Sequence, residues 1–186
     1  NFADVMERVA RVVKDIEPHD SVERYTQLGV DVVIGRAKIT SPWHVEITQD
    51  DGSKQTLSTR AIVIATGAAP FVPPLPGLQD VGFLTSDTLW EIREQPKRLV
   101  VLGGGPIGCE LAQSFARLGS EVTQIEMLPR IMIREDEEVS AYAKKALESD
   151  GVKILTGHKA LRCEKKGEVK IIVVESNGQE TAIEFD

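Results

Sequence analysis

Three glycines and one carboxylate carry the most specific chemical signal in this sequence. The stretch "LVVLGGGPIGCELAQSFARLGSEVTQIE" (99–126) places Gly103, Gly105 and Gly108 in a G-x-G-x-x-G pattern. An apolar run precedes the glycines and a helical pattern follows them, which is the context that a dinucleotide-binding turn requires. The free N–H groups and the dipole at the start of such a helix favour a bound pyrophosphate. The pattern therefore predicts a dinucleotide site.

Each residue of this turn has its own expected role. Gly103 permits the tight turn, Gly105 lets the backbone approach the pyrophosphate, and Gly108 lets the helix and the strand pack closely. Pro106 suits the first helical position, where no N–H bond is lost. A glycine-rich turn between strand and helix that binds no ligand remains the alternative.

Glu126 ends the next apolar run, about twenty residues further on, where an acidic residue accepts hydrogen bonds from the ribose hydroxyls. A 2′-phosphate would be repelled there, so NAD is favoured over NADP. Two alternatives stay open. In the first, Glu126 is simply a solvated carboxylate at the end of a strand. In the second, Arg130 and Arg134 hold the 2′-phosphate of NADP, although the acidic run 135–138 beside these arginines favours a surface role for them.

Other residues with reactive side chains form no recognisable site. Glu110, in the first helical turn, either favours the helix dipole or reaches a nicotinamide amide. Cys109 and Cys163 have no CxxC partner, and the three histidines show neither triad nor zinc spacing. The sequence therefore predicts no catalytic residue and no metal site.

The composition argues against some classes of binding partner and indicates a cellular compartment. The 186 residues carry a net charge of -7 and no basic stripe, which argues against a nucleic-acid partner. No apolar run is long enough to span a bilayer, and there is no signal-peptide pattern. Two widely separated cysteines indicate a reducing compartment, so we expect a cytoplasmic protein. The chain opens at Asn1 directly into a helical pattern, which suggests a piece of something longer.

The second half of the chain alternates strands and helices, as in an α/β fold with a parallel sheet. Strands are predicted at 98–103, 121–126 and 152–156, and helices at 86–93, 106–118 and 137–149. Two further strands, 168–175 and 180–185, are joined by an Asn177-Gly178 turn.

The first half predicts a helix over 2–16 and a short helix that begins at Asp20 and reaches Leu28. A buried strand is expected at 30–35, and a β-meander around the alternating run 43–48 and the Asp51-Gly52 turn. The apolar run 61–67 is typical of a parallel strand buried on both faces. The proline-rich connector 68–77 predicts a domain boundary.

Three stretches together resemble the pyridine nucleotide–disulfide oxidoreductases, most closely the mercuric reductase and dihydrolipoamide dehydrogenase branch. They are "VIATGAAPFVPPLPG", "LTSDTLWEI" and "RLVVLGGGPIGCELAQSFARLGSEVTQIEMLPRIMIREDEEV". The resemblance covers essentially the whole chain. It implies an FAD domain, an inserted NAD(P) domain and a dimerisation domain in a homodimer. It also implies a reaction in which hydride passes from NAD(P)H to FAD and electrons then pass to a cysteine pair.

By this resemblance, residues 1–75 are part of an FAD-binding domain. Residues 76–186 are a Rossmann-like NAD(P)-binding βαβ domain with a β-meander, and this domain lacks its final strand. The fold, with its partial FAD-domain segment, is of the three-layer type. Positions matching the family's NAD(P) contacts are Gly103, Gly104, Gly105, Pro106, Ile107, Gly108, Glu110, Glu126 and Ala160. Among these, Ile107 matches a residue beside the nicotinamide pocket, and Ala160 matches a backbone contact to the adenine. Positions matching the FAD contacts are Gly35, Ala37, Ala65, Thr66 and Gly67.

The departures from the family pattern also matter. The sequence lacks a first G-x-G-x-x-G for FAD and a C-x4-C redox pair. We therefore expect a central portion of an enzyme that is inactive alone. An NADH oxidase or peroxidase type of flavoenzyme and a non-catalytic NAD-binding module remain alternatives, and the sequence does not identify the final electron acceptor.

Overall fold

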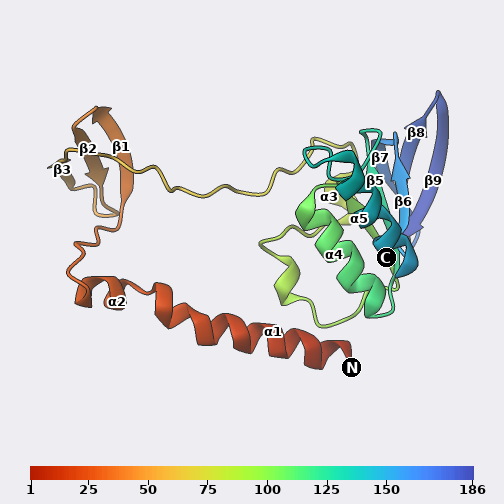
Figure 1. The fold of residues 1–186 in the computed structure, drawn as a ribbon, viewed down its shortest axis with the longest axis horizontal. Coiled ribbons are helices and arrows are strands. Elements are labelled where there is room, and N and C mark those ends of the chain that lie inside the picture. Colours follow the sequence, from red (N-terminus) through yellow and green to blue (C-terminus); the bar gives the residue numbers. More distant parts are fainter. The chain divides into compact units, whose positions relative to one another are not determined.

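The computed structural model describes residues 1–186, which form two compact units (Figure 1). One unit comprises Arg8–Ala69, and the other comprises Pro70–Asp186 together with Asn1–Glu7. The larger unit contains two sheets and the smaller unit contains one.

A parallel sheet lies at the centre of the larger unit. Its strands are β4 (Arg98–Leu102), β5 (Glu121–Glu126) and β6 (Lys153–Thr156), in that spatial order. Helix α4 (Pro106–Arg117) connects β4 to β5, and α5 (Glu137–Ser149) lies between β5 and β6. The predicted βαβαβ alternation and its parallel pairing are therefore confirmed.

Two apolar layers cover this sheet. On one face, Cys109, Ala112 and Phe115 of α4 pack with Val122, Leu147 and two residues of α1 (Phe2–Ile16), Phe2 and Met6. On the other face lies an antiparallel sheet of β7 (Lys159–Lys166), β8 (Val169–Ser176) and β9 (Gln179–Phe185). Ile125 packs there with Cys163, Ile172 and Val174, and with residues of α3 (Leu78–Val81). Figure 1 shows the resulting three layers, with α4 and α5 opposite β7 to β9.

The smaller unit contains an antiparallel meander. Its strands are β1 (Arg36–Ser41), β2 (His44–Thr48) and β3 (Lys54–Ser58). The expected Asp51-Gly52 turn joins the last two strands, with Gly52 at φ +82° and the Asp51 carboxylate accepting a 2.8 Å hydrogen bond from the Ser53 N–H. The rest of α1, the 3₁₀ helix η1 (Glu17–Asp20) and α2 (Val22–Gln27) complete this unit.

The start of the short helix differs from the prediction. Asp20 ends η1, and Ser21 is the N-cap of α2, because its hydroxyl accepts a 3.2 Å hydrogen bond from the Arg24 N–H. Glu23 therefore lies one position earlier in the helix than an Asp20 cap would place it.

The two strands predicted from apolar runs in the smaller unit are wrong. Residues 30–34 and 61–67 adopt no regular structure. In the second run, Val63 is 88% exposed and Ile64 is 71% exposed. An apolar run forms a strand only where a neighbouring strand pairs with its backbone, and neither run is paired in any of the sheets.

The helix predicted at 86–93 is reduced to the 3₁₀ helix η2 (Leu89–Glu91). The Thr85 hydroxyl accepts a hydrogen bond from the Asp87 N–H, and the Thr88 hydroxyl accepts one from the Thr85 N–H. Such side-chain bonds offer the backbone an alternative to helical pairing.

No helix of the chain combines the length and the apolar character that a membrane span requires.

Candidate functional site at the carboxyl end of the parallel sheet

The glycine turn connects the end of β4 to the start of α4. Gly103 has φ +109°, a conformation that favours glycine, and its N–H donates a 2.8 Å hydrogen bond to the Ile125 carbonyl. Gly105 is the N-cap of α4, and its carbonyl accepts the first helical bond, 3.0 Å long, from the Cys109 N–H. The N–H groups of Ile107 and Gly108 therefore lie in the first turn, where no intrahelical acceptor is available to them.

Gly105 and Gly108 serve opposite steric purposes. A Cβ atom on Gly105 would have no other atom within 4 Å, and the residue is exposed. A Cβ atom on Gly108 would collide with the Gly103 carbonyl oxygen. The space next to the Gly105 Cα atom is thus open to a ligand. Gly108 instead permits close packing of α4 on β4, as the spacing of the glycines predicts.

Glu126, the last residue of β5, is fixed to the turn by its carboxylate. Oε2 accepts a 2.6 Å hydrogen bond from the Gly104 N–H, and Oε1 accepts a 2.8 Å bond from the Leu128 N–H. A Cβ atom on Gly104 would lie 3.0 Å from Glu126 Oε2 and 2.9 Å from Ile131 Cγ2, so a larger residue would disturb this contact. The half-buried carboxylate is therefore held in place beside the start of α4, and the simple solvated carboxylate considered above does not describe it.

The loop after β5 closes over the turn. The Met132 N–H donates a 2.6 Å hydrogen bond to the Gly104 carbonyl. The Arg130 guanidinium donates to the carbonyls of Met132 and Ile133, at 3.1 and 3.0 Å. Arg130 is thus engaged with its own loop, and Arg134 is exposed and makes no hydrogen bond or ion pair.

Ile107 and Glu110 lie on the exposed side of α4. Ile107 is 60% exposed and borders an apolar groove of about 750 Å³, together with Gly103, Gly105 and Pro106. The Glu110 carboxylate is exposed and forms no hydrogen bond or ion pair within the chain. Both side chains are therefore accessible to a ligand that crosses the turn.

Ala160 belongs to β7, which begins close to Glu126. The His158 N–H donates a 3.0 Å hydrogen bond to the Glu126 carbonyl, and the Gly157 N–H donates a 2.9 Å bond to the Leu128 carbonyl. Ala160 is half-buried and pairs with Val174 of β8. The larger unit thus gathers the glycine turn, Glu126 and the strand of Ala160 at the same end of the parallel sheet.

The residues that match FAD contacts lie in the smaller unit. Ala37 pairs with Ile47 across β1 and β2, and a Cβ atom on Gly35 would lie 2.7 Å from the Thr48 carbonyl oxygen. Ala65, Thr66 and Gly67 are exposed and outside regular structure, with Gly67 at φ +65°. The structure therefore does not bring these five residues into one compact unit with the glycine turn.

Gln124 is the polar residue at this site that we did not predict. It is 0% exposed, and its Nε2 donates to the Gly103 carbonyl at 3.0 Å and to the Cys109 sulfur at 3.5 Å. Burial raises the pKa of the Cys109 thiol, which keeps that thiol protonated beneath the turn. The signal in the sequence was a glutamine between the two apolar residues of β5, Val122 and Ile125, all three of which are buried.

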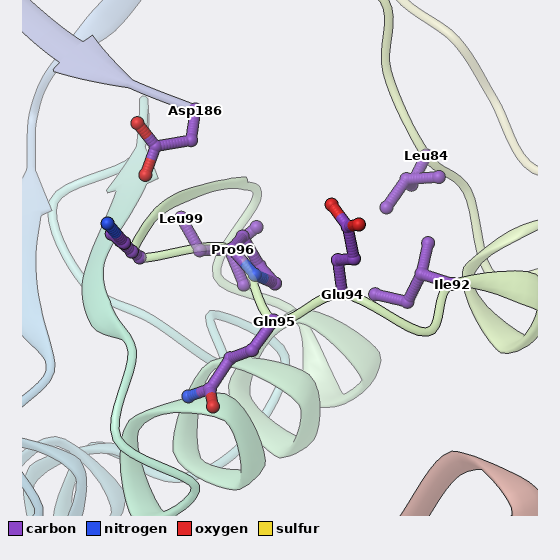
Figure 2. A pocket seen from close by; sticks show the side chains of 8 residues that line it. Leu84, Ile92, Glu94, Gln95, Pro96, Leu99 and Asp186 are labelled. Carbon is purple, nitrogen blue, oxygen red and sulfur yellow. The ribbon is translucent and has the colours of Figure 1, made fainter. Parts of the chain in front are cut away.

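A second hollow, of about 450 Å³, lies away from the turn (Figure 2). Its walls include Leu84, Ile92, Glu94, Leu99 and Asp186. The Asp186 carboxylate is tied to Arg98, 2.9 Å away, and the hydrogen bonds from Arg98 lower the pKa of that carboxyl. None of the lining residues belongs to the glycine turn, so we assign no function to this hollow. The chain also contains no cluster of three or more potential metal ligands.

Mercuric reductases from Lysinibacillus sphaericus and Staphylococcus aureus are 35% and 32% identical over all 186 residues, which is 33% of each relative. A dihydrolipoyl dehydrogenase from Chlorobaculum tepidum is 36% identical over 156 residues, 82% of this chain and 33% of that protein. The chain thus spans about a third of the length of these relatives.

Solved structures agree in fold. The copper(II) complex of a variant of RclA, a HOCl-induced flavoprotein disulfide reductase from Escherichia coli, superimposes with a TM-score of 0.77 at 27% identity. The alignment covers 98% of this chain and 41% of that one. LpdA from Mycobacterium tuberculosis, 21% identical with a TM-score of 0.77, shares the fold. A family model described as pyridine nucleotide-disulphide oxidoreductase matches residues 2–186, and the chain belongs to that family.

Proposed function

We propose that this chain is the NAD(H)-binding portion of an FAD-dependent disulfide oxidoreductase. In this proposal, residues 76–186 bind the dinucleotide and residues 1–75 contribute to an FAD site, within a homodimeric, cytoplasmic parent enzyme. One observation carries the proposal: an open glycine turn begins α4, and the Glu126 carboxylate is fixed beside it.

The turn suits a pyrophosphate. Gly105 leaves open space, and the N–H groups of Ile107 and Gly108 with the helix dipole would stabilise the negative charge. The bound dinucleotide supplies the hydride, so the contribution of this chain is to bind and orient it. The exposed Ile107 and Glu110 would lie beside the nicotinamide, and Ala160 would contact the adenine through its backbone.

The fixed carboxylate favours NADH over NADPH. Each Glu126 oxygen already accepts one backbone hydrogen bond and keeps a lone pair for a ribose hydroxyl. A 2′-phosphate would face this charge, and two unit charges 4 Å apart repel by about 4 kcal/mol at a dielectric typical of protein surfaces. The engagement of Arg130 with two backbone carbonyls weakens the alternative of an arginine-bound 2′-phosphate.

The FAD part of the proposal rests on fewer contacts. Gly35 and Ala37 would meet the adenine through backbone atoms, and Ala65, Thr66 and Gly67 would touch the flavin cofactor at a second place. These residues fit as edge contacts, because they carry no charged group or helix N-terminus for the FAD phosphates.

Isothermal titration calorimetry of the purified chain tests the proposal. We expect one NADH bound per chain, with a lower dissociation constant than for NADPH under the same conditions. Equal affinities, or tighter binding of NADPH, would contradict the assigned role of Glu126. Failure of both nucleotides to bind would contradict the site itself.

A further inference from the structure

Gln124 is buried directly beneath the glycine turn, in the middle of β5. Its Nε2 donates a 3.0 Å hydrogen bond to the Gly103 carbonyl oxygen. Its Oε1 is the one buried side-chain nitrogen or oxygen atom of the chain that has no hydrogen-bond partner. A buried acceptor without a partner is destabilising, so its presence needs a physical reason.

The orientation of this amide is set by the Gly103 carbonyl. Exchanging the amide oxygen and nitrogen would place two acceptors against each other, so Nε2 must face the turn. The unpartnered Oε1 is the consequence of that orientation. An unbranched apolar side chain of similar length would avoid the unsatisfied oxygen but would leave the Gly103 carbonyl without this donor. The two costs are of similar size, so a gain in stability does not by itself explain a glutamine at this position.

The hydrogen bond from Gln124 fixes the orientation of the peptide bond between Gly103 and Gly104. The Gly103 carbonyl and the Gly104 N–H belong to one peptide plane. Gln124 binds the oxygen of this plane, and the Glu126 carboxylate accepts a 2.6 Å hydrogen bond from its N–H. Two side chains of the same strand thus hold the two ends of a peptide between glycines, a bond with little steric restraint of its own.

We propose that Gln124 is a positioning residue for the dinucleotide. It holds the Gly103–Gly104 peptide in the orientation that presents the N–H to Glu126, and it thereby fixes the carboxylate at the ribose position. This role rests on the proposed function, because it acts on the affinity and the selectivity for NADH. It differs from that function in acting through Glu126 and in touching no ligand.

The test is a double-mutant cycle of Gln124→Met and Glu126→Ala, with NADH and NADPH affinities measured by calorimetry. Methionine fills a similar volume and removes both the donor and the unsatisfied oxygen. We expect Gln124→Met to weaken NADH binding roughly three- to tenfold, the range that one net hydrogen bond supports. NADPH binding should weaken less, so that the preference for NADH shrinks. Thermal stability should stay close to that of the wild type, because the variant removes the unsatisfied Oε1 and also the donor to the Gly103 carbonyl.

In the Glu126→Ala background, the methionine substitution should have no further effect on NADH affinity. Unchanged NADH affinity of Gln124→Met, equal losses for both nucleotides, or additive effects in the cycle would each overturn the positioning role. If the methionine variant does not fold, Gln124→Val provides the same comparison, because a β-branched residue suits a strand. A wild-type chain that binds no NADH would instead refute the proposed function, which keeps the two failures distinct.

Discussion

The Glu126 carboxylate and the Gly104 backbone N–H are joined by a hydrogen bond of 2.6 Å. This bond links the end of β5 to the turn that follows β4, and both partners belong to the chain itself. A carboxylate that is already oriented loses little conformational freedom when a ribose binds. Because the same bond holds the Gly104 peptide of the turn, removing the Glu126 carboxylate should affect both the ribose contact and the turn.

Glu126→Ala should weaken NADH binding by about 1.5–3 kcal/mol, the contribution of hydrogen bonds to a charged acceptor. NADPH binding should weaken less or improve, because the repulsion of a 2′-phosphate disappears. Calorimetry with both nucleotides measures the change in preference. Glu121→Ala, at the exposed opposite end of the same strand, is the matched control and should leave both affinities unchanged.

Gly105→Val should abolish NADH binding and leave folding nearly intact. The backbone at Gly105, with φ −75° and ψ 176°, accepts any residue, and a Cβ atom there meets no protein atom within 4 Å. We expect the free energy of unfolding to fall by about 0.5–1 kcal/mol, because valine is a poorer N-cap than glycine. The added side chain would occupy the space assigned to the pyrophosphate, so near-native NADH affinity would show that the turn is not the site.

Gly108→Ala should lower the free energy of unfolding more than Gly105→Val does. Its Cβ atom would collide with the Gly103 carbonyl oxygen, and overpacking of this kind lowers stability by about 1–3 kcal/mol. Urea denaturation of the two glycine variants, side by side, measures this contrast. Equal stability of the two variants would contradict the packing role of Gly108.

Asp150 should make stability depend on pH. Its carboxylate accepts hydrogen bonds from Arg117 and Gln113 of α4, at 2.9 and 2.6 Å, and hydrogen bonds from these two side chains lower its pKa below the ordinary 3.8. A lowered pKa means that the stabilisation is complete above the ordinary value and is lost as the pH falls through the lower, folded-state value. Asp150→Asn should therefore be less stable than wild type at neutral pH.

The stability difference between Asp150→Asn and wild type should shrink as the pH falls below 3.8. Urea unfolding at several pH values measures it, with Asp31→Asn, at an exposed position, as the control. A difference that stays constant across this pH range would show that the charge of Asp150 is not responsible.

The chain alone should hold no FAD and should not turn over NADH. Cys109 and Cys163 are both buried and lie on α4 and β7, so they offer no accessible pair for electron relay. The glycine turn, which we assign to NAD, is the one G-x-G-x-x-G helix start of the chain. Flavin absorbance and NADH oxidation with several electron acceptors provide the measurement, and stoichiometric flavin together with sustained turnover would refute this expectation.

Self-association of the isolated chain is also expected. Strand β4 is at an edge of its sheet, and Val63 and Ile64 are largely exposed. Unpaired edges and apolar surface promote pairing between chains. Sedimentation analysis should reveal oligomers that grow with concentration, whereas a monomer at all concentrations would contradict this expectation.

The β4-α4-β5 unit could be predicted from the sequence to within one residue at each boundary, because its signals are local. Glycines mark the turn, and apolar residues recur at helical spacing between two apolar runs. The runs 30–35 and 61–67 carried an equally apolar signal and form no strand. Apolar character reports a tendency to be buried, and strand formation also needs a neighbouring backbone, which no local pattern reveals.

The sequence predicts which residues belong to the candidate site, and it does not predict the contacts among them. Glu126 is a candidate because of its distance along the chain from the glycines. Its bond to Gly104 depends on how β5 lies beside β4, which is a tertiary relation. Gln124 was missed for the same reason, because its hydrogen bond to the Gly103 carbonyl also depends on how β5 lies beside the turn.

The most direct test of the proposed NAD site is a ¹⁵N NMR titration of the chain with NADH. We expect saturable shifts of the backbone N–H signals of Gly105, Ile107 and Gly108, and a shift of the Gly104 signal through its hydrogen bond to Glu126. The signals of Gly35, Ala37 and Thr66 should stay unchanged. Shifts confined to those three residues, or no saturable shift in the glycine turn, would contradict the assignment of this turn to NAD.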